Sequence, residues 1–167
     1  EQRVDEMSFY YPMAGFHGRG LSDLIARHGF GDSKVIADSL QRLRFQASAG
    51  FMHGFIDLVF EAAGRYYLAD YKSNFLGATP DGYRLAQLNE VMAREQYPLQ
   101  YLIYTVAVHR YLQTRLPDYD YERHFGGAYY LFLRGMDPAL GHRCGVFFDR
   151  PKRALVEALD KQLRGAE

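Results

Sequence analysis

The sequence contains no tryptophan, only one cysteine and no excess of either charge. The single cysteine, Cys144, excludes a disulfide within the chain and is typical of proteins from a reducing compartment. Because 20 basic and 20 acidic side chains give a formal net charge of zero, the chain carries no general basic field that would attract nucleic acid. Any contact with DNA therefore requires a local basic patch, or basic neighbours outside this chain.

Long apolar runs are also missing. No segment approaches the roughly 18 consecutive apolar residues of a membrane-spanning helix. The first residues, EQRVDEM, have neither the basic nor the apolar region of a secretory signal. We therefore expect no membrane partner and a cytoplasmic location. The chain does not begin with Met, so we expect a piece of a larger protein, and its 167 residues suit a single domain over 1–167.

Aromatic residues are abundant, with 14 Tyr and 12 Phe, and hydrophobic periodicity indicates both kinds of element. Strands are expected at 6–11 (ended by Pro12), 51–60, 65–73 and 127–135, with extended segments at 42–45 and 146–148. Helices are expected at 21–29, 32–40, 83–96 and 97–116 and from Pro151 onward, with a loop over 117–127. This order predicts an α/β fold with a mixed central sheet flanked by helices on both faces.

One stretch places charged side chains in an apolar setting. The segment from Gly54 to Asn74, GFIDLVFEAAGRYYLADYKSN, carries Asp57, Asp70 and Lys72 on two apolar strands. Burying an unpaired charge is costly, so these side chains need partners. The simplest partner set is a buried Asp–Lys ion pair with one spare Asp, and the alternative is a divalent metal held by both carboxylates.

The geometry of this hairpin can be predicted from residue numbers. If EAAG forms a four-residue loop, the numbers of paired residues sum to 125, and Asp57 lies opposite Leu68 and diagonal to Asp70. Diagonal Cβ atoms on one face are about 7 Å apart, close enough for both carboxylates to share an ion. Lys72 projects from the same face as Asp70. An even sum would send Asp57 to the other face, so the metal hypothesis requires an odd one.

Oxygen ligands favour Mg²⁺, with Mn²⁺ as a substitute, over Zn²⁺. Such an ion lowers the pKa of a bound water and neutralises charge that develops on a phosphate. Lys72 could orient that water or hold the phosphate oxygens. The backbone carbonyl of Tyr71 lies beside the carboxylates and is a further candidate oxygen ligand.

Asp57 followed by Asp70-Tyr71-Lys72 matches the D…D-x-K pattern of the PD-(D/E)xK nuclease superfamily. With GFIDLVF, LADYKSN, Gln100 with Tyr104, and YDYERHFGGAYYLFLRGM, the chain resembles the C-terminal nuclease domain of the RecB subunit of bacterial RecBCD (exonuclease V) from about Glu6 onward. The resemblance implies a restriction-endonuclease-like sheet, Mg²⁺ on Asp57, Asp70 and the Tyr71 carbonyl, and a catalytic Lys72.

The resemblance also assigns Gln100 and Tyr104 to a Q-x-x-x-Y signature, and their spacing of four places both on one helix face. Glu6 is an accessory candidate. The family's metal-ligating histidine lies upstream of the strand that matches EMSFYY and is not in this sequence. His53 is the candidate substitute; without such a ligand, the isolated chain could bind Mg²⁺ weakly and be inactive.

The resemblance implies two functions. One is an exodeoxyribonuclease that hydrolyses phosphodiester bonds of DNA, in single strands and at double-stranded ends, with RecC and RecD as partners and a helicase upstream in the same polypeptide. Its context is recombinational repair of double-strand breaks and degradation of foreign DNA. The alternative is a module that docks RecA for loading onto single-stranded DNA, through exposed helix faces near 83–94 or 151–163. Neither the polarity of cleavage nor a RecA surface can be located from the sequence.

Overall fold

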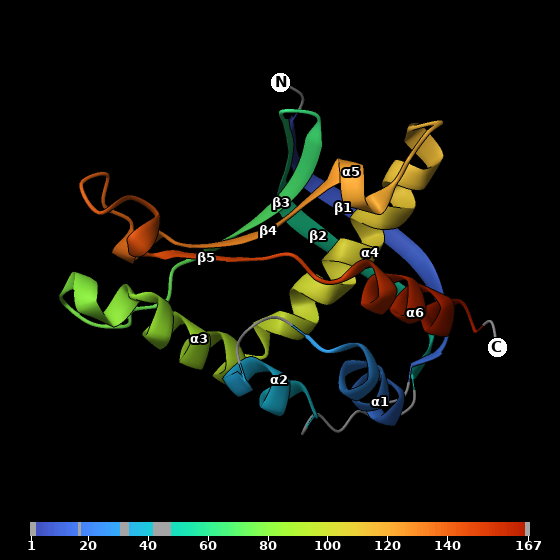
Figure 1. Ribbon diagram of the computed structural model, residues 1–167, viewed down its shortest axis with the longest axis horizontal. Coiled ribbons are helices and arrows are strands. Elements are labelled where there is room, and N and C mark those ends of the chain that lie inside the picture. The colour runs from blue at the N-terminus through green and yellow to red at the C-terminus, as the bar shows by residue number, and fades with distance from the viewer. Residues whose placement is uncertain (1–2, 17, 31–33, 42–47, 166–167) are drawn as a thin grey trace.

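A computed structural model describes residues 3–16, 18–30, 34–41 and 48–165 of the chain. Five strands form one mixed sheet in the order β1-β2-β3-β4-β5 (Figure 1). Neighbouring strands are antiparallel except β3 and β4, which are parallel. The strands are β1 Arg3–Phe16, β2 Ser48–Ala62, β3 Arg65–Lys72, β4 Phe125–Phe132 and β5 Val146–Asp149.

Helices fill the connections between the strands (Figure 1). They are α1 Gly18–His28, α2 Lys34–Gln41, α3 Leu85–Arg94, α4 Tyr97–Arg115, α5 Tyr121–His124 and α6 Arg153–Arg164. Short 3₁₀ turns occur at Pro80–Tyr83, Leu133–Gly135 and Gly141–Arg143. None of the helices in these ranges is long and apolar enough to cross a membrane.

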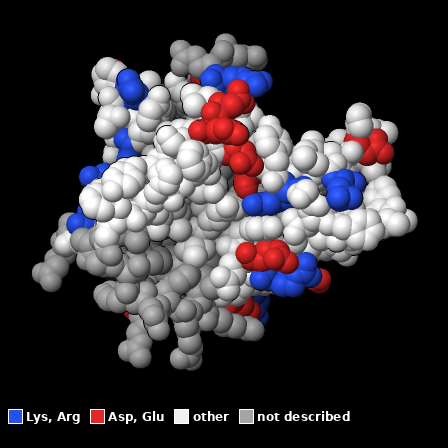
Figure 2. Space-filling model, turned by 180° about the vertical axis from the view of Figure 1, so that it is seen from behind, with Lys and Arg blue, Asp and Glu red and all other residues white. Residues whose placement is uncertain are grey.

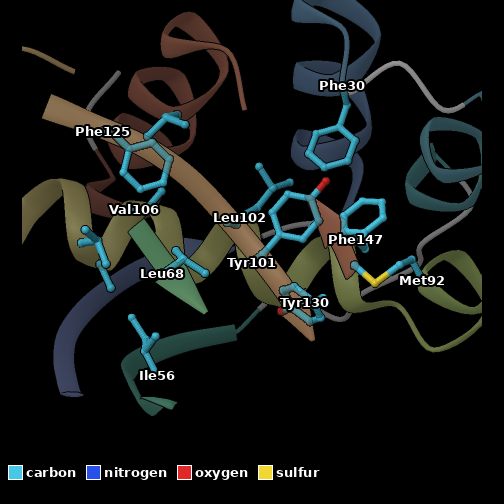
Figure 3. Close-up of a cluster of buried hydrophobic side chains, with 14 of the residues drawn as sticks. Phe30, Ile56, Leu68, Met92, Tyr101, Leu102, Val106, Phe125, Tyr130 and Phe147 are labelled. Atoms are coloured by element: carbon cyan, nitrogen blue, oxygen red, sulfur yellow. The ribbon is translucent and has the colours of Figure 1, made fainter. Parts of the chain in front are cut away.

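The core lies between the sheet and α4. Leu102 and Val106 of α4 face Leu68 of β3 and Phe125 of β4, and all four side chains are fully buried (Figure 3). Pro98 lies in the first turn of α4, where a backbone N–H has no hydrogen-bond partner within the helix, so the lack of an N–H in proline costs no helical hydrogen bond. The long helix that follows places Gln100 and Tyr104 next to the last residue of β3 and the middle of β2.

The mixed α/β class is confirmed, and most expected elements occur near their expected bounds. The prediction that Pro12 ends the first strand is wrong: β1 continues to Phe16, and Pro12 pairs with Phe51. An edge strand tolerates proline because one side of it needs no ladder hydrogen bond. The expected loop over 117–127 contains α5, which begins where the Asp120 carboxylate accepts a bond from Arg123 N at 3.0 Å. The extended segment expected at 42–45 lies outside the described residues.

The hairpin loop is shorter than predicted. Ala62 pairs with Arg65, so the loop is Ala63-Gly64 rather than the four residues EAAG. Both loop residues have positive φ, 51° and 76°, which is the signature of a type I′ turn and matches the twist of the strands. The paired numbers therefore sum to 127, as in Leu58 with Ala69, and not to 125. The sum is still odd over Leu58 to Ala62, but the partner predicted for Asp57 is wrong, because Leu68 pairs with Val59.

The face of the sheet turned away from α4 carries an open depression of about 640 Å³. All its lining residues come from strands, among them Leu58, Phe60, Ala69 and Tyr129. Phe60, Tyr67 and Tyr129 contact one another through their rings on this face, with centroids 5.3 to 6.4 Å apart. The two faces of the sheet therefore differ: the α4 face is a closed core, and this face is apolar and partly open.

Candidate functional site

Asp57 and Asp70 meet across β2 and β3. The printed register of the ladder ends with Leu58 opposite Ala69, and Asp57 and Asp70 follow directly on the two strands. The two carboxyl groups are close enough for the charge of Asp57 to act on Asp70. Asp57 Oδ2 also accepts a hydrogen bond from Tyr71 N at 2.8 Å. The two carboxylates predicted to share a site are therefore brought together, by a different pairing from the one expected.

Asp57 lies at an irregularity in the sheet. Ile56 and Val59 are both buried although they are three residues apart, so the alternation of side chains along β2 changes phase near Asp57. Glu6 lies next to Asp57 on β1, between the pairs Asp5–Leu58 and Met7–Ile56, and has a positive φ of 52°. A non-glycine residue with such a φ costs energy and is often found at functional positions. The accessory candidate is thus beside the site, with an exposed side chain.

Lys72 forms a nearly buried ion pair with Asp70. Lys72 Nζ lies 2.6 Å from Asp70 Oδ1 and 3.0 Å from Oδ2, and the two side chains are 12% and 6% exposed. The ammonium also lies over the rings of Tyr97, at 4.1 Å from the centroid, and Tyr130, at 5.0 Å. Aromatic faces stabilise a desolvated cation, so the position of Lys72 is held from several sides.

Gln100 connects Lys72 to α4. Its Oε1 accepts bonds from Lys72 Nζ at 3.0 Å and from Tyr130 OH at 2.9 Å. Its Nε2 donates to Tyr104 OH at 2.9 Å, as expected for residues four apart on one helix face. The pair predicted from the Q-x-x-x-Y spacing therefore belongs to the same network as Asp70 and Lys72.

Two residues of this network, Tyr97 and Tyr130, were not predicted from the sequence. Tyr97 is three residues before Gln100 on α4, so the helical spacing could have indicated it. Tyr130 pairs with Asp70 in the parallel ladder between β3 and β4. Nothing local to residue 130 signals that pairing, because 52 residues separate Lys72 at the end of β3 from Phe125 at the start of β4, and the two strands meet only in the tertiary structure.

The electrostatics of the site are dominated by burial. Burial raises the pKa of the Asp70 carboxyl above its ordinary value, with Lys72 opposing the shift and the nearby Asp57 adding to it. Burial, followed by the charge of Asp70, also raises the pKa of the Tyr104 hydroxyl. A further positive charge beside Asp70 would stabilise the ionised form of this carboxyl.

The residues present fit a hard divalent cation. Mg²⁺ is usually bound through one or two carboxylates and keeps several waters, so the facing pair Asp57 and Asp70 is a sufficient protein ligand set. Within the described ranges no group of three or more His, Cys, Asp or Glu side chains is arranged for a metal, which disfavours a closed zinc site. Both Asp70 oxygens accept from Lys72, and each oxygen keeps a further lone pair that an ion could use.

The histidine proposed as a substitute ligand has other contacts. His53 is exposed and its ring lies 5.0 Å from that of Phe55 and 6.2 Å from that of Tyr10. The described chain brings no third metal-ligating side chain to Asp57 and Asp70, and Tyr71 remains a ligand candidate through its carbonyl alone. The side chain of Tyr71 is exposed, on the side expected.

No family model matches the chain. Among characterised proteins, it is 52% identical to RecBCD enzyme subunit RecB of Haemophilus influenzae over 120 residues, which is 72% of this chain and 10% of that protein. It is 41% identical to RecB of Escherichia coli K12 over 160 residues, covering 96% of this chain and 13% of the relative. RecB of Mycobacterium tuberculosis is 41% identical over 180 residues, 96% of this chain and 16% of the relative. The chain is therefore homologous to a segment of the RecB subunit of RecBCD over almost its whole length, and spans less than a fifth of the RecB proteins that it matches.

Proposed function

We propose that the chain is the Mg²⁺-dependent nuclease domain of a RecBCD-type helicase–nuclease, of the exonuclease V type. The observation that carries the proposal is the nearly buried Asp70–Lys72 pair close to Asp57, with Gln100 bonded to Lys72. Homology to RecB supports the same assignment. The wider context is also proposed: DNA as substrate, RecC and RecD as partners, a cytoplasmic bacterial location and a role in recombinational repair and in degrading foreign DNA.

Each residue has a role in this proposal. Asp57, Asp70 and the carbonyl of Tyr71 hold the ion, and Mn²⁺ could replace Mg²⁺. When bound, the ion supplies an activated water and neutralises phosphate charge. Lys72 Nζ, released in part from Asp70, donates to the attacking water or to a phosphate oxygen. Gln100 and the two tyrosine rings keep the ammonium within reach of the scissile phosphate, while Tyr104 keeps the Gln100 amide oriented.

The test measures cleavage and metal binding separately. Labelled single-stranded DNA is incubated with the wild-type chain and with Asp70→Asn, with and without Mg²⁺, and Mn²⁺ binding is followed by electron paramagnetic resonance. We expect Asp70→Asn to lose both cleavage and tight Mn²⁺ binding. Asp81→Asn is the matched control, because Asp81 is an exposed carboxylate paired with Arg84 away from this network. Unchanged cleavage by Asp70→Asn would refute the proposal.

The role as a RecA-docking module stays a prediction. The helices suggested for it, α3 and α6, both bury an apolar face in the core, through Leu88, Val91 and Met92 in α3 and four residues including Leu155 in α6. A pull-down of RecA by the wild-type chain and by Lys72→Ala would separate docking from catalysis.

A further inference from the structure

An arginine lies at the end of the parallel strand pair that carries Lys72. Lys72, the last residue of β3, pairs with Phe132, the last residue of β4, and the 3₁₀ turn Leu133–Gly135 follows β4 directly. Arg134 of this turn donates from Nε to the carbonyl of Ser73, the residue after Lys72, at 2.9 Å. The carboxyl ends of neighbouring parallel strands form the edge at which α/β sheets bind ligands. Arg134 therefore lies at the ligand-binding edge of the sheet, beside the candidate site.

The guanidinium of Arg134 keeps donors for a ligand. Arg134 is exposed, and in the part of the chain that the structure describes it has no carboxylate partner and only the Nε bond to Ser73. Other exposed arginines, such as Arg84 and Arg153, are paired with carboxylates. The four N–H donors on Nη1 and Nη2 of Arg134 thus have no acceptor among the described residues. Such a planar fork matches the oxygens of a phosphate.

The backbone around Arg134 is held in place. Gly135 packs so closely against Tyr83 that a Cβ atom at residue 135 would lie 2.2 Å from Tyr83 Cγ. Tyr83 is buried, and its hydroxyl accepts from Leu76 N at 3.1 Å and donates to the carbonyl of Asn74 at 3.4 Å. One side chain therefore supports both the turn that carries Arg134 and the segment that follows β3. A guanidinium placed in this way loses little freedom when it binds an anion.

The charges around the site make this arginine useful to a phosphate. In the proposed function, the metal and Lys72 act on the scissile phosphate, and the strand carries a further phosphate one nucleotide away. On the β1 side that phosphate would be repelled, because Asp5 and Glu6 are exposed there beside Asp57. Figure 2 shows a row of acidic side chains that ends against basic ones. Towards the ends of β3 and β4, the exposed Arg134 would instead attract the neighbouring phosphate.

Resting on the proposed nuclease function, we propose that Arg134 binds the phosphate that adjoins the scissile one and so anchors the strand beside Lys72. Its Nη groups donate to the oxygens of that phosphate in the bidentate geometry typical of arginine. Arg134 takes no part in bond breaking, and Ser73 holds its Nε so that the fork faces the substrate. The structural alternative is that Arg134 only ties the ends of β3 and β4 together through Ser73.

The experiment compares three variants with the wild-type chain. Arg134→Gln removes the fork, and Arg134→Lys keeps the charge without the fork. Arg65→Gln is the matched control, because Arg65 also joins β3 to β4, through the carbonyls of Glu122 and Phe125. Arg65 is at the other end of β3, about 23 Å from Lys72 at the usual rise of about 3.3 Å per residue.

Each variant is measured on two strands. The first is fluorescein-labelled oligothymidylate with a phosphate at every linkage. The second has a neutral methylphosphonate at every other linkage, so each remaining phosphate lacks a charged neighbour whichever way the strand lies. Initial rates of Mg²⁺-dependent cleavage give KM and kcat. Anisotropy without Mg²⁺ gives the affinity for the first strand at several salt concentrations.

We expect Arg134→Gln to raise KM on the first strand about ten-fold, with kcat within about two-fold, because the contact is equal in the ground and transition states. On the second strand this variant and the wild type should have the same KM. The slope of log affinity against log salt should become shallower by about 0.7, as expected for one lost phosphate contact. Arg65→Gln should match the wild type. Arg134→Lys should raise KM about three-fold on the first strand alone, and it decides the test if Arg134→Gln does not fold.

An unchanged KM for Arg134→Gln on the first strand would overturn the proposal. An equal rise in KM on both strands would also overturn it, because the loss would not depend on the neighbouring phosphate and would match the structural alternative. A wild-type chain that cuts neither strand in Mg²⁺ would refute the nuclease assignment. The salt slope measured without Mg²⁺ would then still decide whether Arg134 contacts a phosphate.

Discussion

Two buried ion pairs, Asp70–Lys72 and Asp160–Arg110, differ in how their charges are balanced. Both pairs are 6% to 13% exposed. Arg110 Nε bonds one oxygen of Asp160, Arg164 Nε bonds the other at 2.9 Å, and the guanidinium of Arg110 lies over the Tyr11 ring. There, two cations surround one carboxylate. At the candidate site, one ammonium pairs with Asp70, and a second carboxylate, Asp57, lies nearby and accepts from Tyr71 N.

The comparison distinguishes an ion pair that joins two helices, here called the clamp, from a site whose negative charge is only partly balanced. Arg110 joins α4 to α6, and its rigid fork also bonds the Asp160 carbonyl, so the pair is fully satisfied by protein. Lys72 is a point charge on a flexible stem that can leave Asp70 without breaking an element. Two neighbouring carboxylates beside one ammonium leave a net negative charge that a divalent cation would offset, whereas two guanidinium groups already balance Asp160.

The largest effect should come from Lys72→Met. Removing the charged donor should reduce Mg²⁺-dependent cleavage by about 10²- to 10³-fold, since it acts where charge develops in the transition state. Cleavage rates of labelled single-stranded DNA at saturating Mg²⁺ give the comparison. Arg110→Met, which removes the cation of the Asp160 pair, is the control. At a temperature where this variant is folded, its cleavage rate per folded molecule should stay within about three-fold of the wild-type rate. Equal losses in the two variants would contradict the distinction.

The same two substitutions should affect stability in the opposite order to cleavage, with Arg110→Met the more destabilising. Arg110→Met leaves Asp160 buried with one partner fewer and should lower the free energy of unfolding by about 3 to 5 kcal/mol. Lys72→Met should cost less, because the pKa of Asp70 is already raised and the carboxyl can take up a proton in place of its partner. Urea unfolding at neutral pH, followed by circular dichroism, measures both. A larger loss for Lys72→Met would show that the site is also the stronger clamp.

The raised pKa of Asp70 also predicts a pH dependence. A carboxyl with a higher pKa in the folded state binds protons more readily when folded, so its contribution to stability falls as pH rises from the unfolded pKa through the folded one. Asp70→Asn has no carboxyl to titrate, so its free energy of unfolding should not fall between these two pKa values. Relative to the wild type, the variant should therefore become more stable as the pH rises through this range. Mg²⁺ affinity should change in the other direction, weakening about ten-fold per pH unit below the raised pKa. Calorimetric titrations and unfolding curves at several pH values test both trends, and a flat Mg²⁺ affinity across the window would exclude Asp70 as a ligand.

The smallest effect should come from Tyr130→Phe. It removes one hydrogen bond to Gln100 Oε1 and keeps the ring beside Lys72, so stability should fall by about 1 kcal/mol and cleavage by less than about ten-fold. Tyr129→Phe, on the opposite face of β4, is the matched control and should leave cleavage unchanged. A loss as large as that of Lys72→Met would give Tyr130 a direct role in the chemistry.

Much of the site could be predicted from local spacing. Asp70 and Lys72 share a face because they are two apart on a strand, and Gln100 and Tyr104 because they are four apart on a helix. The partner of Asp57 was predicted wrongly, because EAAG reads as a four-residue loop whereas Ala63 adopts a positive φ that sequence disfavours for alanine. Tyr130 could not be found, because parallel pairing of β4 with β3 has no signal in either strand.

By itself the sequence determined the types of element and the faces that Asp70 shares with Lys72 and Gln100 with Tyr104, because periodicity of two or about 3.6 residues is a local property of the backbone. Only the tertiary structure decided which faces meet. The two-residue turn set the register that brings Asp57 close to Asp70, the parallel ladder brought in Tyr130, and the path of α4 placed Gln100 on Lys72. These contacts depend on packing between distant segments, and that packing gives the nearly buried Asp70–Lys72 pair its neighbours.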